Sequence, residues 1–392
     1  MTDMPIPESP ETYPRRILLA VTGLSPQIVT ETLYALAVKR DPAWVPTEIQ
    51  VVTTVRGAEE ARLNLFSEDR DWFARMCREY NLPRIAFGAG DIHVMRRRDG
   101  AVLEDIRDEA DNMAAADFIT EHVRAITADT RASLHASIAG GRKTMGFFLG
   151  YALSLFGRAQ DRLSHVLVSA PFESHQDFYY PSLVTRVLHK DNQTFDAKDA
   201  EVWLGDIPFV RLRDGMPEAL LAGASRFPDS VIAAQRALAP PSLVVELSDD
   251  SARIEAGGVV VDMPPADAAF YFMMTRAALD GRTLRWDDPG LADAYLREYT
   301  RIAGPARYEE AEKRLADPLR DEWFEERKAK CNAVLRRVLG KAAALAYEIR
   351  GSGGRGRMRF GLAVSSDMIH LLEDIPGAAA SLPVRRGPDQ TG

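Results

Sequence analysis

Two glycines, two cations and a threonine stand together in this chain, as Gly140, Gly141, Arg142, Lys143 and Thr144. An alternating apolar pattern precedes them and an apolar segment with helical spacing follows, which predicts a strand, a tight loop and a helix start. Backbone N–H groups at a helix start are unpaired, and glycine has no Cβ to keep a phosphate away from them. The residues therefore predict an anion-binding loop, to which Arg142 and Lys143 add positive charge.

The same residues also fit a simpler interpretation, a glycine turn that carries two solvated cations. They do not form the phosphate loop of nucleoside triphosphatases. In that loop Gly-Lys precedes Ser or Thr and another glycine stands five residues earlier, whereas here Arg142 separates Gly141 from Lys143 and the earlier glycine is missing. Hydrolysis of a nucleoside triphosphate is therefore not expected.

A second loop carries hydroxyl groups directly after the first predicted strand. It contains Thr22, Gly23, Ser25 and Gln27. We expect the hydroxyl of Thr22 or Ser25 to cap the helix that begins at Pro26. Loops at the carboxyl ends of parallel strands share one edge of the sheet, so this loop and the glycine loop should face one crevice. No dinucleotide-binding glycine pattern occurs, so NAD is not expected.

Strand and helix patterns alternate through the first half of the chain. Predicted strands cover residues 16–22, 48–55, 84–87, 91–96, 134–139 and 166–169, and predicted helices cover residues 26–39, 58–80 and 112–126. This alternation predicts an α/β fold, a Rossmann-like doubly wound parallel sheet with its ligand beyond the carboxyl ends of the strands. Residues 202–204 and 208–212 are predicted as further short strands.

Several segments of this half resemble a family of CRISPR-associated ring nucleases, namely residues 17–36, 103–107 with Asn112, 139–145, 160–168 and 207–211. The resemblance spans residues 15–215. It implies a CARF domain, the Rossmann-like sensor of cyclic oligoadenylates made by type III CRISPR systems. It also implies a homodimer, because two copies of one site would clasp a symmetric cyclic ligand.

The resemblance further implies an enzyme that cleaves its ligand, expected to be cyclic tetra-adenylate, and thereby switches off the signal. A ribose 2′-hydroxyl would attack its own 3′-phosphate and leave a 2′,3′-cyclic phosphate, with no metal or cofactor. Lys143 is then expected to stabilise charge, and Ser25 or Thr22 to hold a phosphate or the hydroxyl. The other expected ligand-binding residues are Gly23, Gln27, Gly140, Gly141, Arg142, Thr144, Asp105, Arg107, Asn112 and His175.

Four of these residues have a second interpretation that the sequence leaves open. Asp105, Arg107 and Asn112 lie beside a predicted helix start, where caps and solvated ion pairs are common. His175 fits a general acid or base at the ligand edge, and it equally fits a side chain packed among Phe178 and the tyrosines that follow. No His, Asp and Glu cluster has metal-ligand spacing, so no metal site is expected.

The second half has a different pattern. Residues 216–241 predict a connecting helix. Residues 242–372 predict a hairpin, helices that end in a basic one, and a last hairpin around a glycine-rich turn. This order resembles a winged helix-turn-helix, a smaller α+β domain whose last hairpin is the wing. Residues 1–14 and 373–392 are expected to be disordered.

Positive charge is concentrated at residues 327–359, which hold ten Lys and Arg and one acidic residue, Glu348, in a chain with a net charge of −8. This segment predicts a polyanionic partner, either DNA or the cyclic ligand covered by the second domain of the opposite subunit, unless it is only a solvated basic face. The alternative function is therefore a cyclic-oligoadenylate-responsive winged-helix transcription regulator that binds DNA. A HEPN ribonuclease is excluded, because its Arg and His pattern matches only residues 158–165, in a predicted loop.

No apolar run is long enough to span a bilayer. The first 14 residues carry Pro and Glu where a secretory signal needs basic and then apolar residues. We therefore expect a cytoplasmic protein with no membrane partner.

Overall fold

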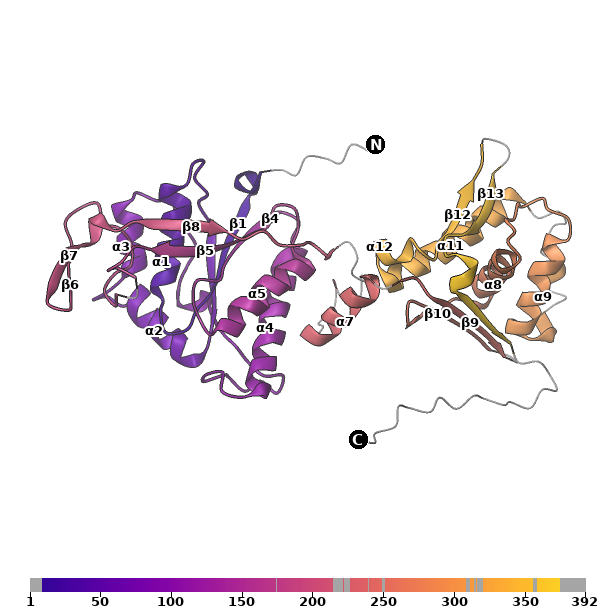
Figure 1. Cartoon of the computed structure of the whole chain (residues 1–392), viewed down its shortest axis with the longest axis horizontal. Coiled ribbons are helices and arrows are strands. Elements are labelled where there is room, and N and C mark those ends of the chain that lie inside the picture. Colours follow the sequence, from indigo (N-terminus) through magenta and orange to yellow (C-terminus); the bar gives the residue numbers. More distant parts are fainter. Residues whose placement is uncertain are drawn as a thin grey trace, which may run out of the picture. The chain divides into compact units, whose positions relative to one another are not determined.

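The computed structural model describes residues 9–173, 175–213, 221, 226–238, 240–248, 251–307, 311–313, 315, 320–354 and 358–373. The chain divides into two compact units, residues 1–235 and 236–392. Each unit has its own elements (Figure 1). In the part of the chain that is described, no helix is both long and apolar enough to cross a membrane.

The first unit is built on a six-stranded sheet in the order β3-β2-β1-β4-β5-β8. The first five strands in that order run parallel, and β8 runs antiparallel to β5. Mixed α/β architecture with a largely parallel sheet confirms the predicted Rossmann-like class. The bounds are β1 Arg15–Val21, β2 Glu48–Thr53, β3 Ile92–Val94, β4 Ala132–Ser137, β5 Arg162–Val168 and β8 Val202–Asp206.

Helices cover both faces of this sheet, and β1 shows why its sequence is a continuous apolar run. Ile17 and Leu19 are buried with residues of α4 and α5, whereas Leu18 and Ala20 are buried with residues of α1, α2 and α3. A strand buried on both faces needs apolar residues at every position. The bounds are α1 Gln27–Tyr34, which continues as a π turn at Ala35–Lys39, α2 Val55–Phe66, α3 Trp72–Glu79, α4 Glu109–Ala128 and α5 Lys143–Phe156.

Three predicted elements of the first unit differ in the structure. The helix expected at residues 58–80 is two helices, because the polar segment between them ends at Asp71 in a left-handed conformation with φ of 40°. The strand expected at residues 84–87 forms a single bridge, between Ala86 and Glu48. Residues 208–212 form no strand, and the N–H of Leu212 instead donates to the carbonyl of Ser154 at 2.8 Å.

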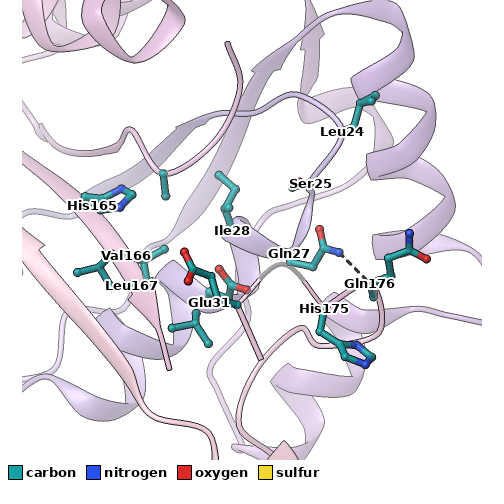
Figure 2. Close-up of a pocket in the computed structure, with 13 residues that line it drawn as sticks. Leu24, Ser25, Gln27, Ile28, Glu31, His165, Val166, Leu167, His175 and Gln176 are labelled. Carbon is teal, nitrogen blue, oxygen red and sulfur yellow. Dashed lines mark hydrogen bonds between the residues drawn. The ribbon is translucent and has the colours of Figure 1, made fainter. Parts of the chain in front are cut away.

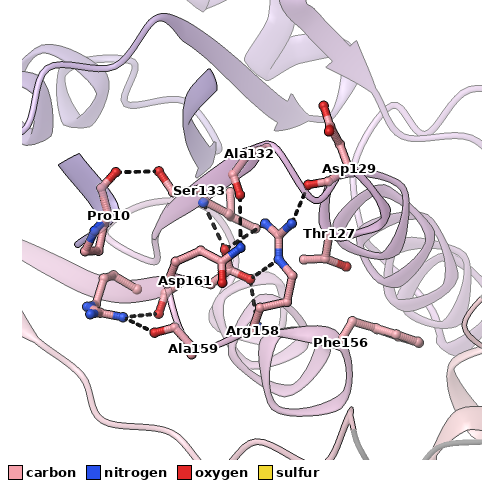
Figure 3. Close-up of polar contacts among 12 residues, drawn as sticks. Pro10, Thr127, Asp129, Ala132, Ser133, Phe156, Arg158, Ala159 and Asp161 are labelled. Atoms are coloured by element: carbon pink, nitrogen blue, oxygen red, sulfur yellow. Dashed lines mark hydrogen bonds and ion pairs between the residues drawn. The ribbon is translucent and has the colours of Figure 1, made fainter. Parts of the chain in front are cut away.

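A buried ion pair fixes the edge of the sheet where β4 and β5 begin (Figure 3). Arg158 donates two hydrogen bonds to the carboxylate of Asp161, both at 2.9 Å, and Asp161 also accepts from the N–H of Leu134 at 3.0 Å. The chain before β1 joins this edge, since Ser133 Oγ donates to the carbonyl of Pro10 at 2.9 Å. Ordered structure therefore begins before residue 15, within the segment that was expected to be disordered.

The remaining elements of the first unit are short. A hairpin, β6 Val187–Lys190 and β7 Gln193–Asp196, stands apart from the main sheet. Helix α7 Phe227–Leu238 contains the division between the two units. The connecting helix expected at residues 216–241 lies partly on α7 and partly outside the described residues. Short 3-10 turns are Pro10–Thr12, Ala89–Asp91 and Ala197–Asp199.

The second unit packs helices against a four-stranded sheet in the order β11-β10-β9-β14. Strand β14 runs parallel to β9, and the other pairs are antiparallel. The strand bounds are β9 Leu243–Ser248, β10 Ser251–Ala256, β11 Val259–Val260 and β14 Ile369–Glu373, with a separate hairpin of β12 Ile349–Ser352 and β13 Arg359–Leu362. The helices are α8 Pro265–Leu279, α9 Leu291–Ala303, α11 Asp321–Leu339 and α12 Lys341–Ala344, and the 3-10 turns are Pro305–Arg307 and Ser366–Met368.

Strand β14 was not predicted from the sequence. Its last residue, Glu373, falls in the segment expected to be a disordered tail, and the rest of that segment lies outside the described residues. Between α8 and α9, Leu284 forms an isolated β-bridge with Phe360 of β13. This bridge ties the β12–β13 hairpin to the segment between α8 and α9.

Candidate functional site

The structure brings the two predicted loops together at the carboxyl edge of the sheet. One loop joins β1 to α1 and the other joins β4 to α5. A Cβ added to Gly23 of the first loop would lie 3.3 Å from the Cα of Gly141 in the second. Gly141 also has φ of +82°, which side chains rarely adopt. Glycine is therefore required here for the close approach and for the backbone turn. Gly140 lies against β1, with an added Cβ 3.2 Å from the carbonyl oxygen of Val21.

The hydroxyl groups of the β1 loop have different roles. Thr22 is buried, and its Oγ1 donates to the carbonyl of Ser25 at 3.0 Å, so this hydroxyl holds the loop closed. Ser25 is exposed, and its hydroxyl has no hydrogen-bond partner among the described residues. The expectation that Thr22 or Ser25 caps α1 is wrong. Pro26 occupies the N-cap position and no side chain caps this helix, because Thr22 is bonded within the loop.

Arg142 is paired with one of the predicted ligand-binding acids. Its Nη2 lies 2.5 Å from a carboxylate oxygen of Asp105, and Arg107 approaches the same carboxylate at 4.0 Å. The hydrogen bond from Arg142 lowers the pKa of Asp105, which keeps the pair charged. Asn112 lies further along, in the first turn of α4, where its N–H donates to the carbonyl of Asp108 at 3.0 Å.

Lys143 is the first residue of α5 and is exposed, as is Thr144. Its ammonium group forms no hydrogen bond or ion pair with any residue in the described ranges. No side chain caps α5, and the N–H of Met145 in its first turn donates to the carbonyl of Arg142 at 2.9 Å, so among the described residues the N–H groups of Lys143 and Thr144 remain available. A cation without a counter-ion beside an uncapped helix start can attract an anion through its charge. The backbone N–H groups of the helix start can donate hydrogen bonds to the same anion.

Two cavities flank the β1 loop, and Leu24 and Ser25 line both. The first, of about 320 Å³, lies between the two loops, and we call it the loop cavity. It gathers the predicted residues Ser25, Asp105 and Arg142 with both close-packed glycines. Its full lining is Gly23, Leu24, Ser25, Thr54, Arg56, Glu104, Asp105, Gly141, Arg142 and Met145. Lys143, Thr144, Arg107 and Asn112 are not part of this lining.

The second cavity, of about 340 Å³, lies between α1 and β5, and we call it the β5 cavity (Figure 2). Among the predicted residues it contains Ser25, Gln27 and His175. Its other lining residues were not predicted, and they are Leu24, Ile28, Glu31, Ala139, His165, Val166, Leu167, Val168, Glu173 and Gln176. Gln27 donates through Nε2 to the carbonyl of Gln176 at 3.2 Å, which ties α1 to the segment after β5.

Glu31 is the most unusual side chain of the β5 cavity. It is only 8% exposed, and in the described part of the chain it has no hydrogen-bond partner. Burial raises its pKa to about 8, and the negative charge of Glu173 adds to the shift. The carboxyl group is therefore largely neutral at pH 7. The sequence contained one sign of Glu31 as a site residue, a single acidic side chain among the apolar residues of the first helix.

His175 is held by the backbone through both ring nitrogens. Its Nδ1 accepts from the N–H of Asp177 at 3.1 Å, and its Nε2 donates to the carbonyl of His189 at 3.1 Å. His175 is buried, as are Phe178 and the two tyrosines that follow. In this conformation neither nitrogen is free to exchange a proton with a ligand. His165 on β5 lines the β5 cavity and was not among the predicted site residues.

Most of the residues that line the two cavities lie in a region that matches a known family. The sequence model of the family described as CRISPR-associated protein NE0113 matches residues 25–240, more than half of the chain. The chain belongs to this CRISPR-associated family. The match begins within the β1 loop of this NE0113 family member and ends just after α7, so β9 and the elements that follow lie outside it. None of the curated proteins compared with the chain matches it.

In this NE0113 family member the two predicted loops lie together at the edge of the sheet, as expected. The β5 cavity beside them was not predicted. In the described ranges, no group of three His, Cys, Asp or Glu side chains comes together as a metal site. The chemistry that the geometry offers is anion binding at the start of α5 and polar recognition in the β5 cavity.

Proposed function

We propose that this protein is a ring nuclease that binds cyclic oligoadenylate, with cyclic tetra-adenylate as the expected substrate, and cleaves it to end type III CRISPR signalling. The observation that carries the proposal is the meeting of the β1 and β4 loops beside the uncapped start of α5, in a member of a CRISPR-associated family. This edge of a Rossmann-like sheet is where ligands bind. Phosphates suit the helix start, and the adenines need shaped cavities beside it.

The reaction needs alignment and charge stabilisation more than a strong base. The 2′-oxygen of a ribose attacks the neighbouring phosphorus, the bond from phosphorus to the 5′-oxygen breaks, and the 2′-hydroxyl proton passes through solvent to the leaving oxygen. The products end in a 2′,3′-cyclic phosphate and a 5′-hydroxyl. Lys143 stabilises the charge that develops on the phosphoryl oxygens, and Ser25 holds the phosphate or the attacking hydroxyl.

Lys143 is the better candidate of the two cations for this role. Arg142 is already neutralised by Asp105 at 2.5 Å, whereas Lys143 has no counter-ion among the described residues. A symmetric cyclic ligand is best held by two copies of one site, so the proposed enzyme is a homodimer.

The test is the cleavage of cyclic tetra-adenylate and cyclic hexa-adenylate in excess EDTA by the parent and by Lys143→Ala. The parent should release products that end in 2′,3′-cyclic phosphate. Lys143→Ala should slow cleavage by roughly 10²–10³-fold, the usual loss when one group that stabilises the transition-state charge is removed.

Lys198→Ala is the matched control, because Lys198 is an exposed lysine that lines neither cavity. Equal thermal unfolding of the three proteins shows that the fold is intact. Cleavage by folded Lys143→Ala at the parental rate would remove Lys143 from the mechanism. Activity that is lost in EDTA and restored by magnesium or manganese would contradict the metal-independent reaction.

A second candidate function, a ligand-responsive regulator that binds DNA, is favoured by the order of elements in the second unit. The elements follow one another in the order of a winged helix-turn-helix. They are helix α8, the Leu284 bridge to Phe360, helices α9 and α11, and the β12–β13 hairpin. The basic segment is less open than its sequence indicated, however. Most of its described cations have acidic partners, in the pairs Arg327–Asp267, Lys328–Glu325, Lys330–Glu326, Arg336–Glu348 and Arg359–Asp288.

These pairs favour the ring nuclease over the regulator, since a DNA-binding face needs cations that are free to contact phosphates. Arg355 and Arg357 lie outside the described residues. Nanomolar duplex binding by the parent that weakens steeply with salt, together with no ligand cleavage, would reverse this order.

A further inference from the structure

The β5 cavity contains a carboxyl group that the proposed reaction does not use. Glu31 and Ile28 extend into this cavity from α1, and Val166 from β5 (Figure 2). It is more than nine-tenths buried, and none of the described residues forms a hydrogen bond with it. Its carboxyl oxygens are not fully enclosed by protein and open into the cavity, where a ligand can supply the hydrogen bonds that the protein does not.

The cavity has the size and lining of a pocket for a nucleobase. Its volume of about 340 Å³ lies at the lower end of the range for small-molecule sites. Apolar side chains from α1 and β5, among them Ile28 and Val166, provide walls for a flat ring. Ser25 lines both this cavity and the loop cavity, so a nucleotide whose base enters here would keep its phosphate near the β1 and β4 loops.

We propose that the β5 cavity binds an adenine of the cyclic oligoadenylate and that Glu31, as a neutral carboxylic acid, reads the edge of that base. This inference rests on the proposed function. A neutral carboxyl group has one O–H donor and one carbonyl acceptor side by side, as the carboxamide of Gln does. A carboxamide pairs with adenine by donating to a ring nitrogen and accepting from the N6 amine. Protonated Glu31 makes the same two bonds.

The ionised form of Glu31 cannot make this pair, because it has only acceptors and would repel the lone pair of the ring nitrogen. At the edge of the base that carries N7, the neutral form also selects adenine over guanine, since guanine presents two acceptors there, O6 and N7, to the single donor. Glu31 is thus the residue that determines base specificity.

The surroundings of Glu31 keep it neutral. Burial is the main cause of its raised pKa, and Glu173, on the segment after β5, adds repulsion from across the cavity. The other titratable side chains that line the cavity are His165 on β5 and His175, whose ring nitrogens are both bonded to the backbone. Binding should therefore be strong below pH 8 and weaken as the pH rises through that value.

The test measures the affinity for cyclic tetra-adenylate with 2′-fluoro riboses, which lacks the attacking hydroxyl, by calorimetry between pH 6.5 and 9. Parental affinity should fall about fivefold from pH 8 to pH 9, because the protonated fraction of a group with a pKa of about 8 falls from about one half to about one eleventh. Glu31→Gln should bind within about threefold of the parent at pH 7 and keep that affinity at pH 9. Glu31→Ala should bind at least about tenfold more weakly at both pH values.

Glu173→Gln supplies a readout that a purely structural role would not change. Removing the charge of Glu173 lowers the pKa of Glu31, so the loss of affinity should move to lower pH. Two outcomes overturn the inference while the proposed function stands, namely parental affinity in Glu31→Ala, or equally weak binding by Glu31→Gln and Glu31→Ala. If the parent binds no cyclic oligoadenylate at any pH, the proposed function fails, and the inference fails with it.

Discussion

Glu31 has a consequence for stability as well as for recognition. The pKa of Glu31 is raised from 4.5 to about 8 in the folded protein. Between these values the unfolded chain releases this proton while the folded chain keeps it, so the free energy of unfolding falls as the pH rises, by at most ~1.4 kcal/mol per pH unit. Below pH 4.5 both states are protonated and the penalty disappears.

Glu31→Gln should therefore stabilise the protein in a pH-dependent way. The gain relative to the parent should be small at pH 5 and largest near pH 8, where the parent bears most of the penalty. Urea unfolding at pH 5, 6.5 and 8 measures it, with Glu59→Gln, an exposed acid on α2, as the control that should show no such trend. A stability difference that does not change with pH would show that Glu31 keeps an ordinary pKa.

Individual site residues differed in how well the sequence predicted them. Gly140 and Gly141 were found because a glycine pair after a strand pattern has a local physical meaning, and the structure places them where two loops meet. Glu31 and His165 were missed. A single acid in an apolar helix or a single histidine in a strand is common, and its meaning here depends on a cavity formed by residues more than a hundred positions apart.

At the scale of elements, apolar patterning predicted the strands of the first sheet, because burial on both faces leaves a continuous local signal. The strands that depend on distant partners were missed. Strand β14 is short and finds its place only by pairing with β9. The β6–β7 hairpin was also missed, although its two strands are neighbours in the sequence and pair with each other apart from the main sheet. Residues 208–212 show the opposite error, a predicted strand that the structure does not contain. Phe209 packs into the core without joining a strand.

The Arg158–Asp161 pair holds the starts of β4 and β5 in place, and we expect its loss to destabilise the first unit. Asp161→Ala leaves the largely buried guanidinium of Arg158 without its partner and removes the acceptor for the N–H of Leu134. The first unit should lose about 3–5 kcal/mol of unfolding free energy, the usual cost of breaking a buried pair from one side. Chemical unfolding measures this.

Ligand affinity at a temperature where Asp161→Ala is folded should match the parent, because the pair lies at the opposite edge of the sheet from the two loops. A loss below about 1 kcal/mol would mean that the pair contributes no more than an exposed one.

At the scale of the whole molecule, the net charge of a segment was a poor guide to its surface. Residues 327–359 are strongly basic in sequence, yet acids from outside that segment, among them Asp267 and Asp288, neutralise several of its cations. Only the fold could show those partners. The second core likewise becomes visible only in the fold, because its buried residues are spread through the sequence from Leu243 to Ile369.

Removal of β14 should destabilise the second unit selectively. Deleting residues 369–392 removes buried Ile369 and leaves the edge of β9 unpaired, which favours association with other chains. Calorimetry should show a lowered or lost transition for the second unit with the transition of the first unit unchanged, and size-exclusion chromatography should show aggregates. Deleting only residues 374–392 is the matched control and should preserve both transitions. Identical melting of the two shortened proteins would mean that β14 contributes no stability.

The parallel pairing of β9 with β14 also affects how the protein is made. In the sequence the two strands lie near opposite ends of the second unit, but in the fold they are neighbours, and Leu243 of β9 pairs with Ile369 of β14. A ribosome adds roughly 5–20 residues per second, so β9 is synthesised on the order of ten seconds before its partner exists. During that interval the nascent chain carries an apolar strand with one open edge, while every strand of the main sheet of the first unit has already been translated. Chaperones that shield exposed strands should therefore act on this protein late in translation.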